Sequence, residues 1–254
     1  MPSFVAHISC GHELLKKLKI NEEDIIKFQI GNLVPDIKQT DIDYTLDEFI
    51  NRNKIQKAKR ITHFRKKTNK ILEYPHCRIF LEKYEQEAKT HIETLAYFFH
   101  LYTDYYYFKY FLPETITFLD ENMQEVDEIE HLQYVRIHKN GQVLKDKTFF
   151  SKIHQKGLYK EYTRSNQYLM NEFHLNLDTK PLREYLQKNS YTCYVEEIDL
   201  SKIYEVLDKI DRLNEQHPVE SLQIFEEEKL KSLVHEVVET FIDTYKDIIK
   251  NYLK

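Results

Sequence analysis

The stretch that most restricts the fold of this chain is residues 97–111, YFFHLYTDYYYFKYF, in which ten of the fifteen residues are aromatic. Residues 90–111 would form a helix with apolar side chains on nearly every side, and Pro113 would end it. A helix that is apolar all round is typical of the buried centre of a protein. We therefore expect one central aromatic helix that is surrounded by others.

The rest of the chain also favours helices. Only four glycines and six prolines occur in 254 residues, so turn signals are too few for a many-stranded sandwich. Helical periodicity predicts helices at 10–19, 21–31, 159–173, 182–188 and 230–249, of which the second would run from an Asn21 cap to Gly31. Two further helices would begin at Pro75 and after a Ser201 cap. Residues 132–145, with Asn140-Gly141 at the turn, are the one hairpin candidate. We predict a mainly α fold: a single multi-helix domain of residues 1–254 around the central aromatic helix, with at most one small β-hairpin.

Composition and charge exclude several classes of protein. A net charge of −5 with both signs interspersed does not describe a nucleic-acid-binding surface, so we expect no specific nucleic-acid partner. The chain has no apolar run of about 18 residues, so we expect no transmembrane segment. Its start lacks the basic region of a secretory signal. Three cysteines without a metal-like spacing argue against a disulfide framework. We expect a cytoplasmic protein.

His100 and Asp104 stand inside the aromatic stretch. Residues four apart lie on one face of a helix, so the two side chains point the same way. A buried carboxylate costs on the order of several kcal/mol unless something pairs with it. A protonated His100, a basic side chain from elsewhere, or a metal ion would each satisfy Asp104. The pair alone is equally explained by a buried hydrogen bond that fixes helix packing.

Three other residues strengthen the metal interpretation. His7 lies in the apolar segment FVAHISCG, Asp36 lies in the loop predicted at 31–41, GNLVPDIKQTD, and His63 has apolar neighbours. Each alone has an ordinary explanation, since Asp often forms turns. Together with His100 and Asp104 they supply nitrogen and oxygen ligands of the kind that suits zinc or another borderline divalent metal.

The ordered segments that contain these residues resemble a known family. In sequence they are MPSFVAHISCG, GNLVPDI, THF and FFHLYTDYYYFKYF. They resemble the motifs of the zinc-dependent phospholipase C-like family, in a bacterial, non-secreted form. The resemblance covers residues 1–112, the metal-site half, and leaves 113–254 as a helical extension without an assigned role. Members are mostly helical and hydrolyse phosphoesters, which implies a small phosphoester or a phospholipid headgroup as the substrate.

The resemblance also implies a role for each ligand. Asp36, His63, His100 and Asp104 would bind the first ion, and Asp104 would bridge to a second ion that His7 helps to hold. A carboxylate on a rigid helix can bridge two ions roughly 3.5–4 Å apart. The expected centre therefore holds one or two zinc ions, or another divalent metal.

Residues for catalysis and substrate binding follow from the same reasoning. Asp36 is the predicted catalytic residue, a ligand that also takes a proton from the attacking water. Arg60 and Arg65 flank His63 and are the predicted phosphate-binding residues. The segment HEVVE places His235 and Glu239 four apart, and we interpret them as the polar edge of an amphipathic helix rather than as ligands.

Two other kinds of function stay open. The chain could be a non-catalytic helical binding or scaffold protein that keeps the core and holds at most a structural metal. A structural metal site is closed, whereas a catalytic site keeps an open coordination position, so the coordination would distinguish them. A membrane-surface role for the basic stretch RNKIQKAKRITHFRKK is less favoured because the total charge is acidic.

Overall fold

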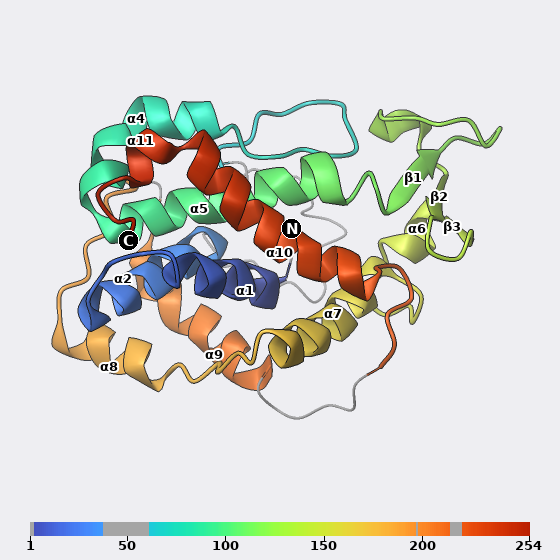
Figure 1. Ribbon diagram of the computed structural model, residues 1–254. Coiled ribbons are helices and arrows are strands. Elements are labelled where there is room, and N and C mark those ends of the chain that lie inside the picture. The colour runs from blue at the N-terminus through green and yellow to red at the C-terminus, as the bar shows by residue number, and fades with distance from the viewer. Residues whose placement is uncertain (1–2, 38–60, 197, 214–219) are drawn as a thin grey trace.

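The computed structural model describes residues 3–37, 61–196, 198–213 and 220–254, and these are mainly helical (Figure 1). The longer helices are α1 Phe4–Leu15, α2 Glu22–Leu33, α4 Cys77–Thr90, α5 Ile92–Tyr106, α7 Leu158–Glu172, α8 Lys180–Lys188, α9 Ile203–Leu213 and α10 Glu227–Thr244. Two short helices are α6 Asp146–Phe149 and α11 Lys246–Ile249, and the strands are β1 Ile116–Leu119, β2 Tyr134–Ile137 and β3 Val143–Lys145. The predicted mainly α fold is confirmed.

Helix α5 is the predicted central helix. Every residue from Thr94 to Asp104 is buried, and α1, α2, α4 and α10 pack around it (Figure 1). Beyond Tyr106 the helix widens into a π turn, Tyr107–Phe111, in which the Leu112 N–H donates to the Tyr107 carbonyl at 2.8 Å. Such π turns occur often at functional sites. The turn begins only three residues after Asp104.

Helix α1 starts earlier than predicted. Ser3 caps it, since its hydroxyl accepts the Ala6 N–H at 3.2 Å, so the predicted start at residue 10 is wrong. The upstream serine decides the start because its oxygen satisfies an otherwise unpaired N–H of the first turn. Gly11 therefore lies inside the helix.

Helix α2 begins as predicted but ends later. The Asn21 side chain accepts the Asp24 N–H at 2.9 Å, which confirms the cap. The prediction that Gly31 ends the helix is wrong: Gly31 lies within the helix, which continues to Leu33. A 3-10 turn, Val34–Asp36, follows with Pro35 near its start, where the sequence predicted a loop. Proline is accepted there because the first N–H groups of a helix have no internal partner.

The predicted hairpin is confirmed as β2 and β3, with Gly141 at a φ of +68° in the turn. Strand β1 adds a third antiparallel strand, one more than the prediction allowed, in the order β1-β2-β3. Val135 pairs with both Phe118 and Leu144 in the register of the sheet. The small sheet lies beyond the carboxyl end of α5 (Figure 1).

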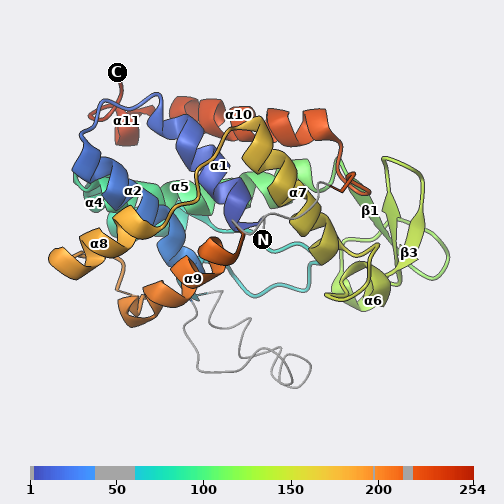
Figure 2. The ribbon, with the colours of Figure 1, turned by 90° about the horizontal axis from the view of Figure 1, so that it is seen from below.

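The second half of the chain covers the first. Helix α7 packs on α1, and α10 packs on α1 and α5, whereas α8 and α9 lie on the opposite side from α10 (Figure 2). The helix predicted at 230–249 is broken into α10 and α11 at Tyr245, where ψ is 32°. Asp199, rather than the predicted Ser201, provides the side-chain cap before α9. None of the helices in the described ranges has the length and apolar character needed to cross a membrane.

Candidate metal centre

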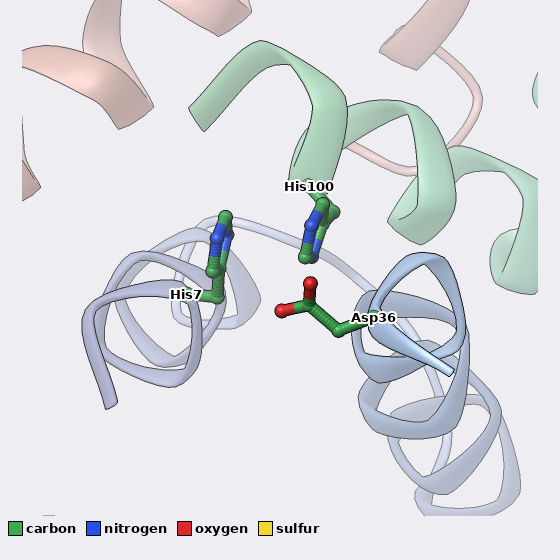
Figure 3. Close-up of side chains that lie close together, drawn as sticks. All are labelled: His7, Asp36 and His100. Carbon is green, nitrogen blue, oxygen red and sulfur yellow. The ribbon is translucent and has the colours of Figure 1, made fainter. Parts of the chain in front are cut away.

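The five predicted ligands meet at one buried point. His7 comes from α1, Asp36 from the 3-10 turn after α2, His63 from the segment before α4, and His100 and Asp104 from α5. The side chains of His7, His100 and Asp104 are fully buried, and that of Asp36 is 3% exposed. Two overlapping triads have ligand atoms within 4.8 Å of one another: His7, Asp36 and His100, and His63, His100 and Asp104. Figure 3 shows the Asp36 carboxylate directed at the edges of the His7 and His100 rings.

The spacing of these atoms suits a metal ion better than hydrogen bonds. His7 Nε2 lies 3.5 Å from Asp104 Oδ1, and His63 Nε2 lies 3.5 Å from Asp36 Oδ1 and 3.7 Å from Asp104 Oδ2. Charge-assisted hydrogen bonds are shorter, about 2.7–2.9 Å. Ligand atoms at tetrahedral positions around zinc lie roughly 3.3–3.5 Å apart, given bonds of about 2.0–2.1 Å. Each of these pairs of donor atoms is therefore spaced like two ligands that share a metal ion.

Several of these buried atoms lack a hydrogen bond. Four of them have no hydrogen-bond partner among the described residues: His7 Nε2, His63 Nε2, His100 Nε2 and Asp104 Oδ1. An unsatisfied buried polar group costs about 1–3 kcal/mol. A single cation at the centre would satisfy several of them at once, so the residues present fit a divalent metal.

Asn32 of α2 contacts two of the candidate ligand residues, the backbone of His7 and the ring of His100. The Asn32 side-chain amide donates to the His7 carbonyl at 2.9 Å, and the Asn32 carbonyl accepts from His100 Nδ1 at 2.8 Å. A proton on Nδ1 leaves His100 Nε2 as a free lone pair that faces the cluster. The rings of His7 and His100 stack, with centroids 3.7 Å apart and an interplanar angle of 5° (Figure 3). The sequence analysis did not identify Asn32, although it lies between the GNLVPDI glycine and Asp36.

Two glycines allow the helices to approach closely enough for these contacts. A Cβ on Gly31 would lie 2.3 Å from the Glu93 carbonyl oxygen of α5. A Cβ on Gly11 would lie 2.8 Å from Asn32 Nδ2. The lack of a side chain at Gly31 therefore brings the Asn32 carbonyl to His100, and the lack of one at Gly11 leaves room for the Asn32 amide.

His63 is held by its neighbours in the chain. Its Nδ1 hydrogen bonds with the Thr62 hydroxyl at 2.9 Å, and the Thr62 carbonyl accepts the hydroxyl of Tyr97 on α5. The next residue, Phe64, has a φ of +50°, in the left-handed region that few non-glycine residues adopt. Its ring packs edge-on against Phe80 of α4, with centroids 5.2 Å apart. Aromatic packing thus stabilises an unusual backbone bend directly beside the candidate ligand His63.

Arg65, one of the predicted phosphate-binding residues, reaches the centre directly. Its Nη2 donates to Asp104 Oδ2, and its guanidinium lies over the Phe108 ring, 5.0 Å from the centroid. Its side chain is 12% exposed and also lines a surface hollow of about 510 Å³ together with Lys66. Arg65 therefore connects the buried cluster with the surface. Arg60, the second predicted phosphate-binding residue, lies outside the described residues.

Burial and neighbouring charges set the protonation of the cluster. Burial, followed by the nearby His7, lowers the pKa of His100 to about 3, and burial also lowers the pKa of His63. Burial alone would raise the pKa of Asp104, but Arg65 and the neighbouring histidines outweigh it and hold the pKa well below its usual range. Neutral imidazoles and an ionised carboxylate are the forms that bind metal ions.

His235 and Glu239 take no part in the cluster. Both are exposed on α10, and Glu239 forms an ion pair with Lys17 at 3.0 Å. The interpretation of HEVVE as the polar edge of an amphipathic helix is therefore confirmed.

Comparisons of the chain with protein-family models, curated proteins and solved structures gave no match.

Proposed function

We propose that this protein is a metal-dependent hydrolase that cleaves a phosphoester bond in a small molecule or a phospholipid headgroup, with one or two zinc ions or another divalent metal as cofactor. The observation that carries the proposal is the meeting of three imidazoles and two carboxylates at one buried point. The resemblance of the motifs within residues 1–112 to the zinc-dependent phospholipase C-like family supports a phosphoester as the substrate.

A divalent metal in this centre would supply a polarised phosphoryl oxygen and a bound water with a pKa lowered to about 7. The chain's own groups account for the remaining steps. Asp36 is the proposed catalytic residue, whose carboxylate takes the proton of the attacking water. Arg65 is the proposed donor to the phosphoryl oxygens.

The stacked rings of His7 and His100 favour two ions over one. The lone pair of an imidazole nitrogen lies in the plane of its ring. Because the two rings are nearly parallel with centroids 3.7 Å apart, one ion cannot lie in both planes. Two ions roughly 3.5–4 Å apart would fit such a pair, and Asp104 has one oxygen facing His7 and the other facing His63.

An anionic substrate would approach the centre along Arg65. The hollow of about 510 Å³ that Arg65 lines also carries Lys66, so positive charge extends from the surface to Asp104. Lys83 and one acidic side chain, Glu82, also line the hollow, and a mainly cationic cleft raises the local concentration of anions. This arrangement supports a phosphate-containing substrate.

The proposal is tested first by the metal content and then by activity. We expect one or two zinc-like ions per chain in protein purified without added metal, and fewer in His100→Ala. The metal-loaded protein should hydrolyse p-nitrophenyl phosphate, its bis ester or a phosphatidyl substrate, lose that activity with a chelator and regain it with zinc. A fully loaded protein that is inactive on all phosphomonoesters and phosphodiesters offered would refute the hydrolase assignment.

The burial of the centre favours a second candidate, a non-catalytic helical protein with a structural metal. The ligand side chains of the described centre are almost completely buried, as is usual for a closed structural site. Cobalt(II) substitution distinguishes the two. Inorganic phosphate should change the visible spectrum of the cobalt protein if a coordination position is open, and should leave it unchanged if the site is closed.

A further inference from the structure

Asp104 is a candidate ligand whose two oxygens face different groups. It is fully buried, its Oδ2 accepts a hydrogen bond from Arg65 Nη2, and its Oδ1 faces His7 at 3.5 Å. The sequence left three ways to satisfy this carboxylate: a protonated histidine, a basic side chain or a metal. The structure places a basic side chain there and, at the same carboxylate, the nitrogen atoms that a metal would need.

The backbone that delivers Arg65 to Asp104 is held in an unfavourable conformation. Phe64 has a φ of +50°, its N–H donates to the Ile61 carbonyl at 3.2 Å, and its carbonyl accepts the His76 N–H at 3.1 Å. Its ring is further fixed by edge contacts with Phe80 and Tyr84. Non-glycine residues keep such a conformation only where the surrounding structure enforces it, and such residues cluster at functional sites. The fold thus keeps Arg65 in place against a conformational cost.

We propose that Arg65 is an internal counter-cation that competes with the bound metal ion for Asp104 and so lowers the affinity of the centre for that ion. In the protonation forms that bind metal ions, neutral imidazoles and ionised carboxylates, Asp36 and Asp104 contribute −2 and Arg65 contributes +1, so the centre without metal carries −1. One divalent ion would change the net charge of the centre to +1, which attracts a phosphate. Without Arg65, the same ion would bring the net charge only to zero. The inference rests on the proposed function only in that the centre must bind a divalent cation.

The competing explanation is that Arg65 only holds Asp104 in the orientation that the metal needs. The two explanations predict opposite changes in metal affinity when Arg65 is replaced. Removal of a competing cation strengthens metal binding, whereas removal of an orienting partner weakens it.

The affinity for zinc should be measured by competition with a chelator in wild type, Arg65→Gln and Arg65→Lys. We expect Arg65→Gln to bind zinc about tenfold more tightly or better, because a positive charge next to the ion is removed. Arg65→Lys keeps the charge and should stay within about threefold of wild type. Arg78→Gln makes the same charge change at an exposed arginine of α4 whose partner is Glu82, and its affinity should match wild type.

Thermal unfolding provides a readout that does not depend on hydrolysis. In excess chelator, Arg65→Gln should unfold at a lower temperature than wild type because Asp104 loses its buried counter-charge. Added zinc should raise the unfolding temperature of Arg65→Gln by more than that of wild type. If Arg65→Gln folds only when zinc is present, the competition measurement starts from the zinc-loaded protein.

An affinity in Arg65→Gln equal to or weaker than that of wild type would overturn this inference alone and would leave the metal centre in place. Absence of zinc binding in wild type and in both variants would overturn this inference together with the proposed function.

Discussion

Replacing Gly31 by alanine tests whether close contact between α2 and α5 builds the metal centre. The new Cβ would lie 2.3 Å from the Glu93 carbonyl oxygen, 2.9 Å from Glu93 Cα and 3.0 Å from Ala96 Cβ. The first two atoms belong to the backbone of α5, so no side-chain rotation relieves the overlap. Helix α2 must move away from α5 by about 1 Å to restore ordinary contact distances.

That movement has a calculable cost in stability. Overpacking of a well-packed interface typically costs about 1–3 kcal/mol. The hydrogen bond of 2.8 Å from His100 Nδ1 to the Asn32 carbonyl would stretch beyond bonding distance, at a cost of about 1 kcal/mol. Alanine regains about 1 kcal/mol because it favours a helix over glycine. We therefore expect Gly31→Ala to lower the free energy of unfolding by about 1–3 kcal/mol.

The distinguishing result is the effect on metal binding. His100 would lose the partner that fixes its ring, so Gly31→Ala should bind zinc about 10–100-fold more weakly. Urea unfolding of the metal-free protein and a chelator competition measure the two effects separately. Gly141→Ala is the matched control: it has a φ of +68° and nothing within 4 Å of the added Cβ, so it should cost about 1 kcal/mol from backbone strain and leave zinc affinity unchanged. Wild-type stability and affinity in Gly31→Ala would refute the reasoning.

Three further outcomes are expected. Elemental analysis should find that His100→Ala loses the bound metal while His235→Ala, an exposed histidine on α10, retains it, and equal metal in both would contradict the site. Glu161→Gln should destabilise the fold by about 1.5–3 kcal/mol in urea titrations, because the buried carboxylate accepts three backbone N–H groups of residues 223–225 at 2.8–3.0 Å, and a change under about 0.5 kcal/mol would count against that role. Asn21→Ala should cost about 1 kcal/mol through loss of the α2 cap, and an unchanged urea midpoint would show that the cap contributes nothing.

The candidate ligands were predictable because they are local signals in unusual surroundings. His100 and Asp104 are polar residues in an apolar stretch, so their side chains need a polar or charged partner when the helix is buried. The supporting residues carry no such signal. Asn32 looks like an ordinary helix residue, and Gly31 looks like a helix end, because the reason for each lies in a neighbouring helix and not in the adjacent sequence.

The charge balance of the centre was not predictable either. The sequence placed Arg65 near His63 and assigned it to the substrate, whereas the structure pairs it with Asp104. That pairing depends on the left-handed backbone of Phe64, which is enforced by rings on α4 and α5. No propensity rule assigns a positive φ to phenylalanine.

The sequence by itself determined the mainly helical class, the central position of the aromatic helix, the hairpin turn at Gly141 and the identity of the five candidate ligands. The first three follow from periodicity and turn composition, which act over a few residues, whereas the candidate ligands stand out as polar residues with apolar neighbours in segments that resemble a known family. Only the tertiary structure decided that α2 continues past Gly31, that a third strand joins the hairpin, and that His7 stacks on His100 while Arg65 reaches Asp104. These features depend on contacts between residues distant in sequence, where close packing and the need to satisfy buried polar atoms outweigh local preference.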